Sequence, residues 1–187
     1  MLLHIKNMVC GRCTMAVRQL MENLNFRVSD LTLGTVQIHP EPDGQQLENI
    51  AASLKMLGFE LIDKEKDQLV ERIKNVIIEL VHHSDLANLE QSIASIIAGR
   101  INRDYTFLSR LFSDSEALTI EKFIIHQKIE KVKELIGYGE MNINEISVKM
   151  GYSSSAHLSA QFKAITGLSP SKFKSAGSPG RTPIDKI

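Results

Sequence analysis

The sequence has no tryptophan, two cysteines and only 5% aromatic residues in its 187 positions. Two cysteines are too few for a disulfide scaffold, and the shortage of aromatic side chains argues against an aromatic-cage or carbohydrate binder. No apolar run approaches the roughly 18 residues that a membrane span needs. His4, Lys6 and Asn7 interrupt the first residues, which leaves no apolar segment for a secretory signal. We therefore expect a cytoplasmic protein with no membrane partner.

Charge of either sign is not in excess, because 22 Lys and Arg balance 22 Asp and Glu. The balance hides an asymmetry between the two ends of the chain. Residues 1–99 carry 9 basic and 13 acidic residues, whereas residues 100–187 carry 13 basic and 9 acidic ones. The C-terminal end is therefore the better candidate for binding a polyanionic partner.

Short strand-like and helical patterns alternate in the first 63 residues. Apolar residues alternate at five places, which predicts strands: Leu3 and Ile5, Phe26 and Val28, Leu31 and Leu33, Val36 and Ile38, Phe59 and Leu61. Helical spacing covers residues 14–24 and 45–57, and Gly58 follows the second helix at a natural stop. The order β-α-β-β-α-β predicts an α+β domain with a ferredoxin-like fold at residues 1–63.

From Lys64 onward the apolar spacing is helical, which predicts an all-α domain at residues 64–175. The charged run at residues 63–67 fits either a linker or the solvated first turn of a helix. Residues 176–187 are rich in Gly, Pro and Ser, so we expect a flexible tail there.

The helical half contains an internal repeat. An offset of fifty residues superimposes Leu108 on Leu158, Phe112 on Phe162 and Phe123 on Phe173. Upstream the offset becomes forty-nine, and each copy then has a small residue, a residue able to adopt positive φ four positions later, and a polar helix start. These are Ala98, Asn102 and Asp104 in the first copy and Ser147, Gly151 and Ser154 in the second. The pattern is typical of two helix-turn-helix units, joined by a long helix from about Ile120 to Ile136.

These residues resemble the AraC/XylS family of bacterial transcription regulators. The closest matching motif runs from Gly151 to Lys163. It is followed by a second matching segment from Gly167 to Lys174. The resemblance implies a double helix-turn-helix domain whose second helices read successive major grooves of double-stranded DNA. The sequence departs from the family pattern at Ala117, Lys128, Val132, Ser147 and Ala160, and the last of these replaces an Arg common in the second recognition helix.

The recognition helices supply the candidate DNA-binding residues. Tyr105, Thr106, Ser109 and Arg110 face away from the predicted core of the first helix, and Arg110 is suited to a bidentate contact with guanine or to a phosphate. Ser155, His157, Gln161 and Lys163 are the candidates on the second helix. Gln161 is suited to adenine and Lys163 to phosphate. The less favoured interpretation of each residue is an exposed polar side chain on a solvated helix. Residues 64–187 hold only 17 basic against 15 acidic residues, so we expect affinity for DNA to depend on a local basic stripe, on dimerisation, or on both.

The two cysteines lie in a loop between the first predicted strand and the first predicted helix. Together with the β-α-β-β-α-β order, this loop resembles the heavy-metal-associated domain of copper chaperones and metal-pumping ATPases over residues 2–62. The loop reads Met8-Val9-Cys10-Gly11-Arg12-Cys13, with Asn7 where the family usually has Gly. The helix start and the positive charge of Arg12 lower the pKa of the two cysteines and so favour their thiolate forms. A pair of soft thiolate ligands favours Cu(I) as the bound ion. Ag, Hg and Zn are alternatives, although Zn usually takes four ligands. We expect Met8 to be a core residue rather than a third ligand.

The combined reading is a sequence-specific transcription regulator that responds to a thiophilic ion held by Cys10 and Cys13, and not an enzyme. No paired carboxylates, nucleophile arrangement or phosphate-binding glycine loop points to catalysis. Three alternatives stay open: a metallochaperone or metal buffer whose helical half binds proteins, a redox sensor, and an N-terminal domain that serves only as a dimerisation or spacer module.

Overall fold

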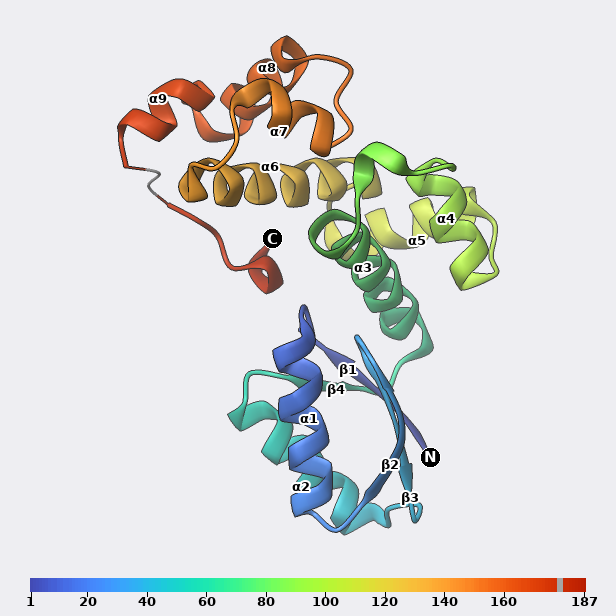
Figure 1. The fold of residues 1–187 in the computed structure, drawn as a ribbon. Helices are drawn as coiled ribbons and strands as arrows, with labels where there is room; N and C mark the ends of the chain where they lie inside the picture. Colours follow the sequence, from blue (N-terminus) through green and yellow to red (C-terminus); the bar gives the residue numbers. More distant parts are fainter. Residues whose placement is uncertain (178–179) are drawn as a thin grey trace. The chain divides into compact units, whose positions relative to one another are not determined.

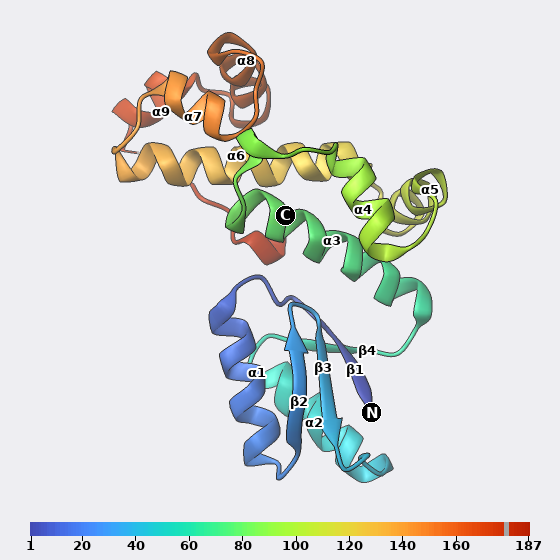
Figure 2. The same ribbon diagram turned by 45° about the vertical axis from the view of Figure 1, so that its right-hand side comes forward.

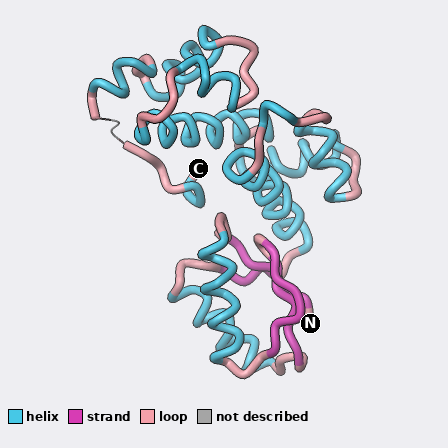
Figure 3. Tube along the Cα trace, in the orientation of Figure 1, coloured by secondary structure: helices cyan, strands magenta, loops and turns pink. Residues whose placement is uncertain are grey.

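The structure is a computed structural model that describes residues 1–177 and 180–187. The chain divides into two compact units, Met1–Asn75 and Val76–Ile187. Among the described residues, all strands belong to the first unit, as Figure 3 shows by colour. No helix in the described part of the chain is long and apolar enough to cross a membrane.

The first unit contains a four-stranded sheet and two helices in the predicted order (Figure 1). The elements are β1 (Leu2–Lys6), α1 (Gly11–Asn23), β2 (Arg27–Thr32), β3 (Thr35–His39), α2 (Gly44–Met56) and β4 (Glu60–Ile62). The strand order is β2-β3-β1-β4, and every neighbouring pair is antiparallel. The tight β2–β3 hairpin turns at Gly34, whose φ of 86° suits glycine.

The core of this unit follows from the period-two alternation along its strands. Leu3 and Ile5 of β1 and Val36 and Ile38 of β3 are buried, whereas their neighbours along each strand are more exposed. Their side chains form one cluster with apolar residues of the two helices, which are Val17 and Met21 of α1 and Ile50 and Leu54 of α2. Figure 2 shows α1 running alongside the sheet. A capping box between Asp43 and Gln46 fixes the start of α2.

In the second unit the described residues form helices joined by turns and loops, with no strand among them. They are the C-terminal part of α3 (Glu65–His83), η1 (Leu86–Asn88), α4 (Ile93–Ile101), α5 (Tyr105–Glu116), α6 (Ile120–Tyr138), α7 (Ile143–Lys149), α8 (Ser155–Thr166), α9 (Pro170–Ser175) and η2 (Ile184–Lys186). The long helix α6 is buried along much of its length, so the shorter helices share it as a common core (Figure 1). The sequence therefore predicted the helical character and the joining helix correctly.

The division between the units falls inside α3, whereas the sequence places a domain boundary between residues 63 and 64, just before this helix. Contacts within the first unit explain the difference. Gln68 donates from its side chain to the carbonyl oxygen of Ile62, and the backbone N–H of Asn7 donates to Glu71 at 3.0 Å. The first turns of α3 are thus bonded to the strands and to the loop that follows β1.

The C-terminal segment, for which the composition predicts a flexible tail, makes contacts that the composition does not predict. Residues 180–187 make several polar contacts with α6, whereas residues 178 and 179 of the predicted tail lie outside the described residues. Arg181 pairs with Glu134 at 2.7 Å, and the backbone N–H of Thr182 donates to Glu130 at 3.0 Å. The side chain of Gln127 donates to the carbonyl oxygen of Ile184. These bonds satisfy charged and amide groups of α6 that are largely buried.

Candidate functional site

The first helix-turn-helix unit consists of α4 and α5. Asn102 ends α4 in the left-handed conformation, with φ 57° and ψ 48°, and the next amide, of Arg103, donates to the carbonyl oxygen of Ala98 at 3.2 Å. The carboxylate of Asp104 accepts hydrogen bonds from the amides of Thr106 and Phe107 and so caps α5. The turn residues therefore act as the sequence predicts.

The second helix-turn-helix unit, which consists of α7 and α8, repeats this geometry. Gly151 has φ 66°, and a Cβ there would lie 3.2 Å from the carbonyl oxygen of Leu86, so both conformation and space favour glycine. The amide of Tyr152 donates to the carbonyl oxygen of Ser147 at 2.9 Å, which matches the bond from Arg103 to Ala98 in the first unit. The Ser154 hydroxyl accepts from the amide of His157 and caps α8.

A pair of phenylalanine rings packs in the core beside each helix-turn-helix unit. The rings of Phe112 and Phe123 have centroids 5.5 Å apart, and those of Phe162 and Phe173 lie 5.3 Å apart. The two pairs are related by the same fifty-residue offset that the sequence shows. Tilted and edge-to-face arrangements at this distance are favourable, so the repeat extends from the sequence to the packing.

On α5 the structure separates the predicted DNA-binding residues into two groups. Thr106 and Arg110 are exposed, whereas Tyr105 and Ser109 are half-buried. The phenol of Tyr105 donates to the Glu121 carboxylate at 2.7 Å, and this hydrogen bond is the largest cause of the lowered pKa of Glu121. Arg110 and Thr106 are therefore the α5 residues that are best placed to reach a ligand.

On α8, His157 and Lys163 are exposed, whereas Ser155 and Gln161 are half-buried. The Oε1 atom of Gln161 accepts a hydrogen bond from the phenol of Tyr152 at 2.7 Å. Burial raises the pKa of Tyr152 to about 12, so its phenol remains a hydrogen-bond donor at alkaline pH as well as at neutral pH. Sequence reasoning placed Gln161 on the outward face but did not see this partner.

Three other residues are exposed near the starts of the two recognition helices. Phe107 is 49% exposed on α5, and Ala156 and Ala160 are exposed on α8. The repeat could have identified them, because an offset of fifty relates Phe107 to His157, Thr106 to Ala156 and Arg110 to Ala160. The two exposed faces thus occupy equivalent positions but differ in chemistry.

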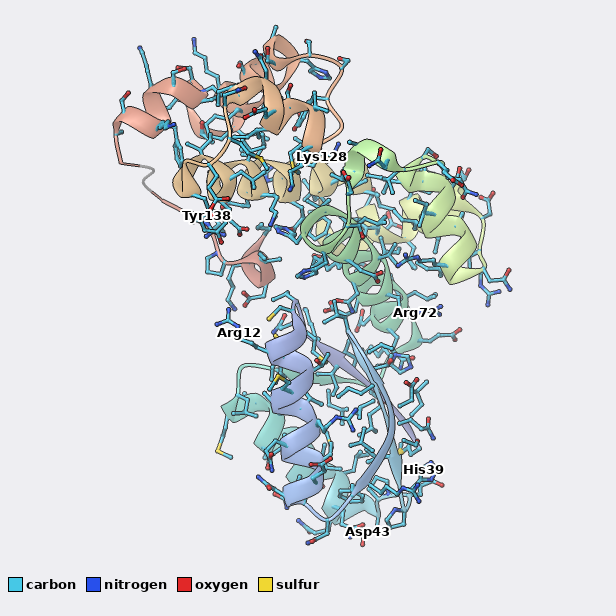
Figure 4. The ribbon with its side chains drawn as sticks, in the orientation of Figure 1. Arg12, His39, Asp43, Arg72, Lys128 and Tyr138 are labelled. Atoms are coloured by element: carbon cyan, nitrogen blue, oxygen red, sulfur yellow. The ribbon has the colours of Figure 1, made fainter. Side chains whose placement is uncertain are left out.

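The cysteine pair lies at the start of α1. The Sγ atoms of Cys10 and Cys13 are 3.6 Å apart, and Cys10 caps the helix through its carbonyl oxygen, which accepts from the amide of Cys13 at 2.9 Å. Burial alone raises the pKa of the Cys10 thiol, but hydrogen bonds from Cys13 and Arg12 outweigh this effect and lower it. Figure 4 labels the exposed Arg12 beside the pair. Two half-exposed sulfur atoms at this distance suit a soft ion that accepts two thiolates.

The loop before the pair contains one residue with positive φ and one fully buried residue. Asn7, which stands where the resembled domain has Gly, adopts φ 71°, a left-handed conformation that asparagine tolerates better than most residues. Met8 is completely buried, as predicted, and belongs to the core cluster. Within the described residues, no group of three or more His, Cys, Asp or Glu side chains is arranged to hold a metal ion.

Comparison with known families bears on the helices from α4 to α9. Residues 97–176 match the family model of a helix-turn-helix domain. The matched segment contains most of α4 and the whole of α5, α6, α7, α8 and α9. This match agrees with the two helix-turn-helix units that the geometry defines.

Individual proteins are also similar to this chain. The chain is 24% identical over 164 residues, 88% of its length, to the Msm operon regulatory protein of Streptococcus mutans, and 22% identical over 130 residues, 70% of its length, to the "Probable transcriptional regulator LumQ" of Photobacterium leiognathi. These matches cover 56% and 50% of the relatives, so the chain spans about half their length. A similar solved structure is the C-terminal domain of AraT, a response regulator from Geobacillus stearothermophilus. It has a TM-score of 0.51 and 23% identity, over 60% of this chain and 88% of that one, and it supports the fold alone.

Proposed function

We propose that the protein is a sequence-specific transcription regulator whose helices α5 and α8 enter successive major grooves of double-stranded DNA, about one helical turn apart. The observation that carries this proposal is the duplicated turn geometry within a segment that matches a helix-turn-helix domain. Each unit has a left-handed turn residue, a capped second helix and an exposed face on that helix. Arg110 supplies the strongest single contact, because a guanidinium can bond two acceptors of guanine at once.

Selection of binding sites from random duplex DNA tests this function. We expect the full chain to enrich one sequence and to bind it with an affinity that falls steeply as salt increases, because phosphate contacts release counterions. The enriched sequence should be bound at least about 10³-fold more tightly than a scrambled duplex at the same salt concentration. Enrichment of no sequence, or equal affinity for both duplexes, would contradict the proposal.

We also propose that the N-terminal unit is a ferredoxin-like, heavy-metal-associated domain in which Cys10 and Cys13 hold a thiophilic ion, with Cu(I) favoured. The short distance between the Sγ atoms, the helix start and the antiparallel β2-β3-β1-β4 order support this assignment. A bound ion would join the loop covalently to the first turn of α1. A coupling of 1–3 kcal/mol between this site and the DNA site would change operator affinity by about 5- to 150-fold.

A competition titration of the reduced protein with Cu(I) and a high-affinity chelator tests the metal site. We expect one ion per chain, loss of binding in the double variant Cys10→Ser and Cys13→Ser, and no change in Met15→Leu, which removes an exposed sulfur from the same helix. Operator affinity is then measured with and without Cu(I).

The outcomes separate the alternatives. Stoichiometric metal binding without specific DNA binding would indicate a metallochaperone or buffer. Specific DNA binding that ignores Cu(I) but changes when the cysteine pair is oxidised would indicate a redox sensor. DNA binding that responds to neither would leave the N-terminal unit as a dimerisation module.

A further inference from the structure

A series of contacts connects the joining helix to the turn of the second helix-turn-helix unit. The ammonium group of Lys128, on α6, donates to the carbonyl oxygen of Met150 at 2.9 Å and lies 5.1 Å from the ring centroid of Tyr152 (Figure 4). A cation at this distance from an aromatic face is attracted to it. Met150 ends α7, so one side chain holds both the end of that helix and the aromatic residue of the turn.

Tyr152 in turn contacts two residues of the recognition helix. Its phenol donates to Oε1 of Gln161 at 2.7 Å, and the ring of His157 meets it edge-on at a centroid distance of 5.5 Å. The position of the Gln161 amide is thus set from outside α8. One lone pair of the carbonyl oxygen is occupied within the protein, whereas both N–H donors of the amide remain for another partner.

This arrangement bears on which base the amide can recognise. A glutamine that reads adenine uses both of its polar atoms: its oxygen accepts from the adenine amino group while its nitrogen donates to N7. Guanine presents two acceptors, N7 and O6, on the same edge. We infer that Tyr152 is a specificity-determining residue that engages the oxygen of Gln161, so that the second recognition helix prefers guanine to adenine at one position.

The first helix-turn-helix unit, α4 and α5, has no equivalent of this arrangement. Arg103 stands at the position that corresponds to Tyr152, and Leu111 stands at the position that corresponds to Gln161. The inference therefore concerns the half of the binding site that α8 contacts, and it rests on the proposed DNA-binding function.

The experiment is site selection followed by affinity measurements with the wild-type chain and the variants Gln161→Ala and Tyr152→Phe. The first variant should lose the preference at one position of the site and keep it elsewhere. The second frees the amide oxygen, so the ratio of affinities for guanine and adenine at that position should fall about fivefold, the effect of one neutral hydrogen bond. Tyr138→Phe, a matched change at an exposed residue of α6, should leave the ratio unchanged.

The results distinguish this inference from the function on which it rests. A wild-type chain that selects no sequence refutes the proposed function. A wild-type chain that selects a sequence overturns the inference if Gln161→Ala leaves every base preference intact. It is equally overturned if Tyr152→Phe weakens binding to all sequences alike and only lowers the unfolding midpoint, because that result assigns Tyr152 a structural role alone.

Discussion

The residue that follows α5 gives a sharp test of the repeat. Ala117 ends this helix with φ 52° and ψ 23°, and Gly167 ends α8 with φ 78° and ψ −11°. The two positions are equivalent in the repeat, and both lie in the left-handed region. A residue that has a Cβ is strained in this region because its Cβ lies too close to the following carbonyl oxygen. We predict that Ala117→Gly stabilises the helical unit.

The size of the effect follows from two opposing terms. The left-handed conformation costs a non-glycine residue about 1–2 kcal/mol. Glycine gains extra freedom in the unfolded chain, which offsets about 0.4–1 kcal/mol of that relief. The net stabilisation should be about 0.5–1 kcal/mol. Gly167→Ala should destabilise by a similar amount, because a Cβ there meets no heavy atom within 4 Å and adds only the backbone strain.

Urea unfolding followed by far-ultraviolet circular dichroism measures these differences on the full chain. Gly137→Ala is the control, since Gly137 lies inside α6 and a Cβ there also meets nothing within 4 Å. In a helix alanine is favoured over glycine by up to about 1 kcal/mol, so this variant should be more stable. If Gly137→Ala behaves as expected while Ala117→Gly is neutral or destabilising, the argument from backbone strain is refuted.

Three further substitutions probe the proposed DNA site, the buried ion pair and the loop before the cysteine pair. Arg110→Ala should weaken binding of the selected operator by about 5- to 150-fold in a fluorescence titration, whereas Arg18→Ala, outside the helix-turn-helix domain, should have little effect. Glu130→Ala leaves the ammonium group of Lys133 buried without its carboxylate, so the free energy of unfolding should fall by about 3 kcal/mol in urea, and a change below 1 kcal/mol would contradict this. Glu71→Ala removes the acceptor for the backbone amide of Asn7, in the loop before the cysteine pair, and should reduce the change in operator affinity on adding Cu(I). Glu71→Gln keeps an acceptor at this position and should retain the change.

The sequence predicted the features that depend on local chemistry. Asn102 and Gly151 were identified as turn residues because few residue types tolerate positive φ, and both adopt it. Asp104 and Ser154 were identified as helix starts because their side chains can accept from backbone amides, and both do so. These requirements act within a few residues, so the amino-acid pattern is sufficient to predict them.

Contacts between distant segments could not be predicted in this way. Helical spacing places Tyr105 and Gln161 on outward faces, but only the packed structure brings Tyr105 to Glu121 and Gln161 to Tyr152. The composition of the C-terminal segment suggests a tail, yet α6 offers it buried charged groups such as Glu130. In each case a polar group of one helix finds its partner through tertiary packing, which leaves no periodic signal.

The two helix-turn-helix units share their structural residues but differ in the residues that they expose, and this difference predicts the form of the operator. Thr106, Phe107 and Arg110 of the first unit correspond to Ala156, His157 and Ala160 of the second. Two half-sites read by such different faces should differ in sequence.

Ala160→Arg tests this difference, because it gives the exposed face of α8 the guanidinium that α5 already has. Sites selected by this variant should gain a guanine preference of about 5- to 150-fold at one position of the second half-site, while the first half-site stays unchanged. The wild-type chain provides the comparison. If it already selects two identical half-sites, the exposed faces do not determine the bases, and the phosphate contacts or the shape of the DNA must account for the specificity.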